Sequence, residues 1–123
     1  MATLTDIELD KAARELSLSY DDGKSYILSA EYLRVYSPSA EVRGHGVGQE
    51  VLQLGKELVA INDVEPIGNY AVRLVYSDGH ETGIYTWEYL EELATNKQQN
   101  WQNYLDRVKE AGKKRKLFVN AAL

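Results

Sequence analysis

The sequence contains no cysteine, only two histidines and two prolines, and no apolar run long enough to cross a membrane. Without thiolates the chain cannot form disulfides, hold a cysteine-ligated zinc or iron–sulfur centre, or use a cysteine nucleophile. Small secreted domains commonly depend on disulfides, and the first ten residues lack the basic and apolar regions of a signal peptide. We therefore expect a cytoplasmic protein with no contact with a membrane.

Charge is unevenly distributed along the 123 residues, whose net charge is −5. Residues 1–93 carry seven Lys/Arg and seventeen Asp/Glu, whereas residues 94–123 carry seven and two. The acidic body disfavours nucleic acid as a partner. Length and an apolar share of 44% are typical of one folded domain. We predict a single domain over residues 1–112, followed by a basic, flexible tail over residues 113–123.

Alternating apolar and polar residues predict β-strands joined by tight turns. The clearest cases are residues 16–20, followed by the turn Asp21-Asp22-Gly23, and residues 70–76, followed by a turn at residues 77–80. Short turns join neighbouring strands in antiparallel order, so we expect an antiparallel sheet of hairpins. Further strands are predicted at residues 5–9, 26–28, 58–61, 64–67 (with a bend at 62–63) and 81–85.

A short helix is predicted after the first hairpin, over residues 30–36, with Ser29 as its N-cap and Pro38 beyond its end. Residues 37–49 then show no hydrophobic periodicity, and we expect a long polar loop of the kind that often carries function. Its glycine-rich run lacks the Lys-Ser/Thr ending of a phosphate loop. Arg43 beside this run could still receive an anion or a partner's carboxylate.

Two C-terminal helices are predicted. Thr86 is a candidate N-cap for the first, and apolar residues repeat at i, i+3, i+4 and i+7 from Trp101 in the second. The spacing also suits one continuous helix, but Lys97 in the apolar stripe favours two. The fold class is therefore α+β: an antiparallel sheet of hairpins, a short helix after the first hairpin, and C-terminal helices packed on the sheet.

The sequence contains few groups of residues whose type and spacing suit catalysis. Neither His45 nor His80 has the spacing of an iron-binding facial triad, and no Gly-x-Ser-x-Gly elbow accompanies a candidate serine. We expect no enzymatic activity and no cofactor. A zinc or iron site made by His45, His80, Asp78 and Glu81 remains open as an alternative on ligand type alone.

Three segments in order resemble a known bacterial family. They are Leu-Arg-Val-Tyr-Ser-Pro-Ser-Ala-Glu-Val-Arg-Gly-His at 33–45, Val-Glu-Pro-Ile-Gly-Asn-Tyr-Ala-Val-Arg at 64–73, and Asp-Gly-His-Glu-Thr-Gly-Ile-Tyr-Thr-Trp-Glu-Tyr-Leu at 78–90. The chain is similar over residues 14–112 to stand-alone domains of unknown function related to the N-terminal domain of γ-butyrobetaine hydroxylase. The resemblance implies a compact α+β domain. The oxygenase barrel, with its iron and 2-oxoglutarate, lies outside the resemblance, so we do not expect the hydroxylase activity here.

The resemblance also implies a lost zinc site. In the hydroxylases this domain holds zinc with three cysteines and a histidine, which correspond here to Ser37, Ser39, Val42 and His80. No thiolate remains, so His80 is expected to be structural. Related domains are fused to P-loop iron–sulfur carriers, which implies an accessory role in iron–sulfur cluster or metalloprotein maturation.

Our first functional hypothesis is a non-catalytic protein-interaction domain, because the family motifs are polar and glycine-rich beyond the needs of a core. The partner is expected to be an iron–sulfur carrier, another metalloenzyme or a second copy of the chain. Tyrosines beside the loop, including Tyr89, are candidates for an interface. The predicted face comprises Tyr36, Ser37, Ser39, Glu41, Arg43, His45, Asp78 and His80.

Overall fold

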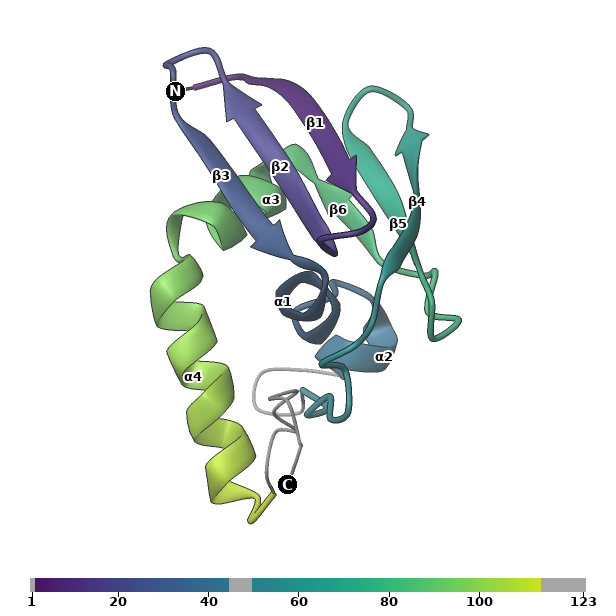
Figure 1. Ribbon diagram of the computed structural model, residues 1–123, viewed down its shortest axis with the longest axis vertical. Coiled ribbons are helices and arrows are strands. Elements are labelled where there is room, and N and C mark those ends of the chain that lie inside the picture. The colour runs from purple at the N-terminus through teal and green to yellow at the C-terminus, as the bar shows by residue number, and fades with distance from the viewer. Residues whose placement is uncertain (1, 45–49, 114–123) are drawn as a thin grey trace.

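The first sheet is made by the N-terminal strands. The computed structural model describes residues 2–44 and 50–113, and begins with β1 (Leu4–Asp10), β2 (Glu15–Tyr20) and β3 (Ser25–Ser29) (Figure 1). These strands form an antiparallel sheet in the order β1-β2-β3. Alternation along β2 buries Leu16, Leu18 and Tyr20 on one face, as the sequence pattern predicts.

The second sheet contains β4 (Ile61–Ile67), β5 (Ala71–Tyr76) and β6 (Ile84–Thr86), again antiparallel and in chain order. The expected hairpins are thus present, but in the described residues they are divided between two three-stranded sheets. The register of β4 shifts between Ile61 and Asp63, where the sequence predicts a bend. Two strand predictions were too long: residues 58–60 and 81–83 are not in strands.

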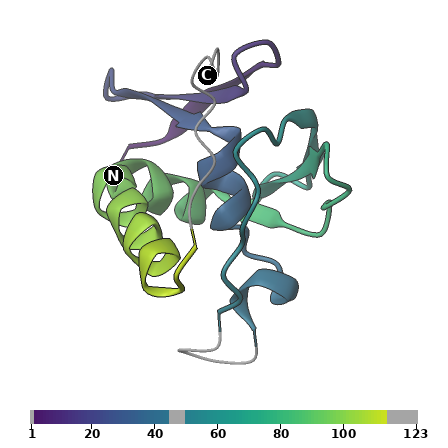
Figure 2. The same ribbon diagram turned by 60° about the horizontal axis from the view of Figure 1, so that its bottom comes forward.

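Helix α1 (Ala30–Val35) occupies the centre of the molecule, between the two sheets, in both views (Figures 1 and 2). All six of its residues are buried. Ser29 caps it as predicted, its hydroxyl accepting a hydrogen bond from the Tyr32 backbone N–H at 3.0 Å. The predicted loop after it was only partly right, because α2 (Ala40–Arg43) forms a single helical turn inside it. Residues 45–49 lie outside the described part of the chain.

The C-terminal helices are two, α3 (Trp87–Thr95) and α4 (Lys97–Glu110), as the polar stretch between them predicts. Thr86 caps α3 by accepting from the Tyr89 backbone N–H at 3.1 Å. Helix α4 is followed by Gly112, whose φ of 69° is easily adopted only by glycine. No helix in the described residues is long and apolar enough to cross a membrane.

One apolar core joins both sheets, α1 and α3 through residues such as Leu18, Leu33, Leu74 and Leu93. A smaller cluster attaches α4 to the end of α1. Helix α1 is therefore the element on which the other layers pack, and the chain that leaves it carries the site described next. The tail after residue 113, predicted to be basic and flexible, lies outside the described residues.

Candidate functional site

A buried polar cluster surrounds His80, which follows the β5–β6 turn. The His80 Nε2 atom lies 2.8 Å from Ser37 Oγ and 3.4 Å from Ser39 Oγ, and Nδ1 lies 3.3 Å from Glu41 Oε2. Burial, followed by the nearby Arg34 guanidinium, lowers the pKa of His80, so its ring is neutral at pH 7. A neutral ring has one donor and one acceptor nitrogen, which suits a carboxylate on one side and a hydroxyl on the other.

The cluster coincides with the zinc position that the resemblance implies, but its residues do not fit zinc. Ser37 and Ser39 lie at His80, and Val42 follows three residues after Ser39, in the single turn of α2. Hydroxyl and isopropyl groups are not the thiolate ligands of such a site. Within residues 2–44 and 50–113 no group of three or more His, Cys, Asp or Glu side chains is placed to hold a metal ion.

The alternative metal-ligand set is not brought together in the described residues. His45 lies outside them, and Glu81 is exposed on the β5–β6 connection. Asp78 contacts the backbone N–H of His80 through Oδ1, at 3.1 Å, and not the imidazole ring. Its other oxygen is already engaged by two cations, Arg34 and Lys56.

Ser37, His80 and Glu41 share the order of atoms found in a serine-hydrolase triad, yet the serine is sealed. Ser37 is 1% exposed. A methyl group added to Gly83 would lie 2.5 Å from Ser37 Oγ, so the hydroxyl packs directly against the Gly83 backbone. A nucleophile needs space for a carbonyl carbon beside its oxygen, and this packing leaves none on that side.

An ion-pair network fixes the turn that carries His80. Asp78 Oδ2 accepts from Arg34 Nε at 2.9 Å and from Lys56 Nζ at 2.6 Å. Burial by itself would raise the pKa of Asp78, but the hydrogen bonds from Lys56, the His80 backbone and Arg34 outweigh it and lower the pKa to about 2.

Asp78→Asn is expected to reduce the free energy of unfolding by about 1–2 kcal/mol at neutral pH, after allowance for solvent screening. The pKa of Asp78 is depressed in the folded state, so its contribution is complete above about pH 5 and is lost as pH falls toward 2. Urea denaturation across this range should show the two proteins converging at low pH. Exposed Asp6, changed to Asn, is the control; a constant difference for Asp78→Asn would contradict the assignment.

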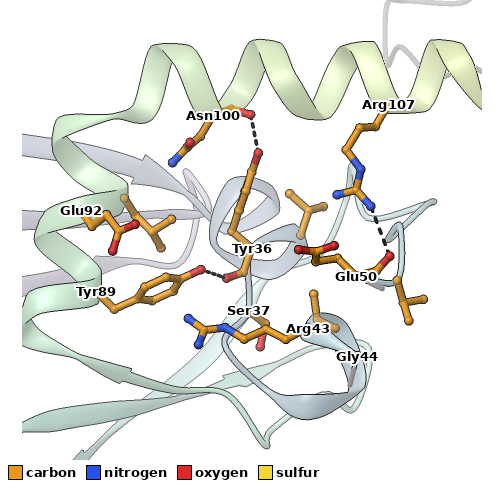
Figure 3. A pocket seen from close by; sticks show the side chains of 13 residues that line it. Tyr36, Ser37, Arg43, Gly44, Glu50, Tyr89, Glu92, Asn100 and Arg107 are labelled. Carbon is orange, nitrogen blue, oxygen red and sulfur yellow. Dashed lines mark hydrogen bonds between the residues drawn. The ribbon is translucent and has the colours of Figure 1, made fainter. Parts of the chain in front are cut away.

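A second feature is a cleft near the C-terminal end of α1, between the α1–α2 segment and helices α3 and α4 (Figure 3). Its volume is ≈ 520 Å³. Its wall combines apolar side chains with arginine, glutamate, tyrosine and asparagine. The lining residues are Val35, Tyr36, Ser37, Val42, Arg43, Gly44, Glu50, Val51, Tyr89, Glu92, Leu93, Asn100 and Arg107.

Tyrosine hydroxyls hold the cleft walls in place. Tyr89 donates to the Tyr36 backbone carbonyl at 2.6 Å, and Tyr36 donates to the Asn100 carbonyl at 2.7 Å (Figure 3). Burial raises the pKa of both tyrosines, so both remain neutral donors at pH 7. The Arg43 guanidinium stacks over the Tyr89 ring, with Cζ 4.8 Å from the ring centroid.

The predicted interaction face is divided by the structure. Tyr36, Ser37 and Arg43 line the cleft, and Glu41 and Asp78 lie nearby with exposed surface. Three of the predicted residues, Ser37, Ser39 and His80, are buried. They offer a partner little surface of their own, and the interaction face stays a prediction. His45 lies outside the described residues.

Sequence reasoning missed the half of the cleft that α4 supplies. Asn100 and Arg107 stand on the polar side of an ordinary amphipathic pattern, and no local motif distinguishes them. Tyr89 was noted only as a tyrosine beside the loop. The sequence does indicate Arg43 as a binding residue, because it is a charged residue next to a glycine-rich run.

Fold and site together define a small α+β domain with a sealed polar cluster beside an open, charged cleft. Residues 7–91 match the sequence model of the family described as γ-butyrobetaine hydroxylase-like, N-terminal, and the chain belongs to this family. No curated protein matches the chain.

The solved structures that are similar to this chain include the following three. Two are NMR solution structures: one is 46% identical, with a TM-score of 0.80, over 100% of this chain and 92% of the other. The second is 48% identical, with a TM-score of 0.81, over 100% and 99%. A crystal structure from Acidithiobacillus ferrooxidans, of a DUF971-family protein of unknown function, is 38% identical, with a TM-score of 0.62, over 74% and 91%.

Proposed function

We propose that this chain is a non-catalytic, cytoplasmic protein-interaction domain whose partner binds in the cleft between the α1–α2 segment and helices α3 and α4. The observation that carries the proposal is the contrast between two neighbouring regions. In the Ser–His–carboxylate cluster the Ser37 hydroxyl packs against Gly83, whereas the cleft is open and presents apolar and charged groups side by side. Binding surfaces commonly combine apolar area with a few fixed polar groups.

Rigidity of the cleft supports the same proposal. Its walls include residues of α1, α2, α3 and α4 and are cross-linked by the hydrogen bonds from Tyr36 and Tyr89. A preformed surface loses less conformational entropy when a partner binds. The buried His80 cluster adds to this rigidity, because Glu41 and Ser39 tie α2 to the β5–β6 turn.

The family relationship gives the proposal its biological direction. We place the partner among iron–sulfur carriers or other metalloproteins, because the resemblance includes related domains that are fused to P-loop iron–sulfur carriers. This chain would then assist maturation by contact and not by chemistry of its own. The acidic body of the chain favours a partner with a basic surface around the contact.

Affinity capture from the native cell, followed by mass spectrometry, tests the proposal. We expect Arg43→Glu to lose a protein that the wild type retains, because it reverses the charge at the cleft wall. Lys24→Glu makes the same charge change in the β2–β3 turn, at the end of the sheet away from α1, and should retain that protein. Loss of no protein from the folded Arg43→Glu variant would remove the cleft as the contact surface.

A further inference from the structure

Five arginines lie in the described residues, and one of them, Arg14 in the β1–β2 turn, lies outside the cleft and is in no ion pair there. Arg34 and Arg73 lie outside the cleft, and each forms an ion pair with a carboxylate of the chain. Arg43 and Arg107 line the cleft, and in the part of the chain that the structure describes neither is within ion-pair distance of a carboxylate. The cleft therefore presents guanidinium groups whose charge no internal carboxylate neutralises directly.

Arg43 is the better placed of the two. Its guanidinium lies over the Tyr89 ring, with Cζ 4.8 Å from the ring centroid, and Tyr89 is itself fixed by its hydrogen bond to the Tyr36 carbonyl. A guanidinium has five N–H donors, so this contact with one ring leaves donors for other acceptors. A planar fork of this kind matches a carboxylate, which it binds through two parallel hydrogen bonds. Arg107 donates to the Glu50 backbone carbonyl, at 3.4 Å.

The surroundings of Arg43 restrict what carries the carboxylate. Val42 and Leu93 form a buried apolar part of the wall, and Val51 is 51% exposed. Glu50 and Glu92 also line the cleft and would repel a run of acidic residues. A single carboxylate next to an aliphatic side chain satisfies both conditions.

We infer that the cleft recognises a peptide segment by a carboxylate bound at Arg43 with an adjacent aliphatic side chain packed on the valine and leucine wall. Figure 3 shows Arg107 reaching in from α4 and Arg43 from α2, on facing walls of the cleft, which suits a segment lying between them. The carboxylate is that of a protein C-terminus or of an Asp or Glu side chain. This inference rests on the proposed function and specifies the chemistry of the partner.

NMR titration of ¹⁵N-labelled protein tests it with three small probes. N-acetyl-leucine presents a C-terminal carboxylate, N-acetyl-glutamic acid α-amide presents a side-chain carboxylate, and N-acetyl-leucinamide presents neither. We expect saturable shifts at Arg43, Val51 and Tyr89 with at least one acid. Arg43→Gln should weaken that acid about tenfold or more, since a charge-assisted hydrogen bond is lost. Lys24→Gln should leave its affinity unchanged.

Each outcome decides the matter. The stronger of the two acids identifies the source of the carboxylate. Equal binding of the amide, an unchanged affinity in Arg43→Gln, or no cleft shifts with either acid overturns the inference. Acid binding without any captured protein leaves the inference intact and removes the proposed function. If protein capture depends on the cleft but neither acid binds, the proposed function stands and this inference is overturned.

Discussion

Ser37→Cys/Ser39→Cys/Val42→Cys is expected to convert this chain into a zinc protein with His80 as the fourth ligand. Ligands of a tetrahedral zinc ion lie about 2.0–2.3 Å from the metal, and therefore roughly 3.3–3.8 Å from one another. The two serine oxygens already lie 2.8 and 3.4 Å from His80 Nε2. Val42 is buried and lies in the helical turn that begins directly after Ser39.

The effect on stability should be large. Structural zinc contributes on the order of 10 kcal/mol of apparent binding energy in small domains. Part of this offsets the native hydrogen bonds that the substitutions remove, so the zinc-free variant should be less stable than the wild type. Saturation with zinc should then raise the melting temperature of the variant by more than about 10 °C. The wild type should show no such shift.

Metal analysis under reducing conditions, combined with thermal denaturation, measures both parts of this prediction. The expected stoichiometry is one zinc per chain. His80→Ala in the same triple background removes one ligand and should weaken zinc binding strongly. Zinc binding that is indifferent to His80 would show that the three cysteines do not meet at the histidine.

Gly83→Ala is expected to destabilise the fold by about 1–3 kcal/mol, the usual cost of an oversized group in a packed interior. The new methyl group would lie 2.5 Å from Ser37 Oγ and 3.1 Å from Tyr85 Cε1. Tyr85 cannot easily move, because its hydroxyl donates to the Leu33 carbonyl at 2.6 Å. Gly83 is required because a side chain at this position would have no room, so the expected loss of stability is steric.

A double-mutant cycle with Ser37→Ala isolates that contact. Removing the serine hydroxyl also relieves its clash with the new methyl, so the double variant should be more stable than the sum of the single effects predicts. Chemical denaturation of the four proteins gives the coupling energy. Gly23→Ala, at a turn where an added methyl meets nothing within 4 Å, measures backbone strain alone. Strictly additive effects would mean that Gly83 and Ser37 are not in contact as described.

Local sequence patterns predicted most elements of this fold, and their limits are physical. Alternation identified the strands, and hydroxyl caps identified the starts of α1 and α3, because both signals depend on neighbouring residues. The division into two sheets was not predictable in this way. Alternation says which face of a strand is buried, but not which distant strands share a ladder. Helix α2 is a single turn, too short to show any periodicity.

The same limit applies to the candidate site, part of which was predictable from the sequence and part of which depends on tertiary packing. The family resemblance correctly brought Ser37 and Ser39 to His80, across about forty residues of sequence. Their polarity suggested an exposed face, yet inside the protein these side chains are hydrogen-bonding partners of one another. Arg107 reaches the cleft from α4 only through the packing of helices, a relation between residues that no single segment encodes.

The central position of α1 has a consequence for how the chain unfolds. Both sheets and α3 cover a helix whose six residues are all buried. Detaching either sheet would expose this helix to water, so neither half of the protein retains a core when the other is lost. We expect the two sheets to melt together in one cooperative transition. Local opening is then left to segments outside this shared core.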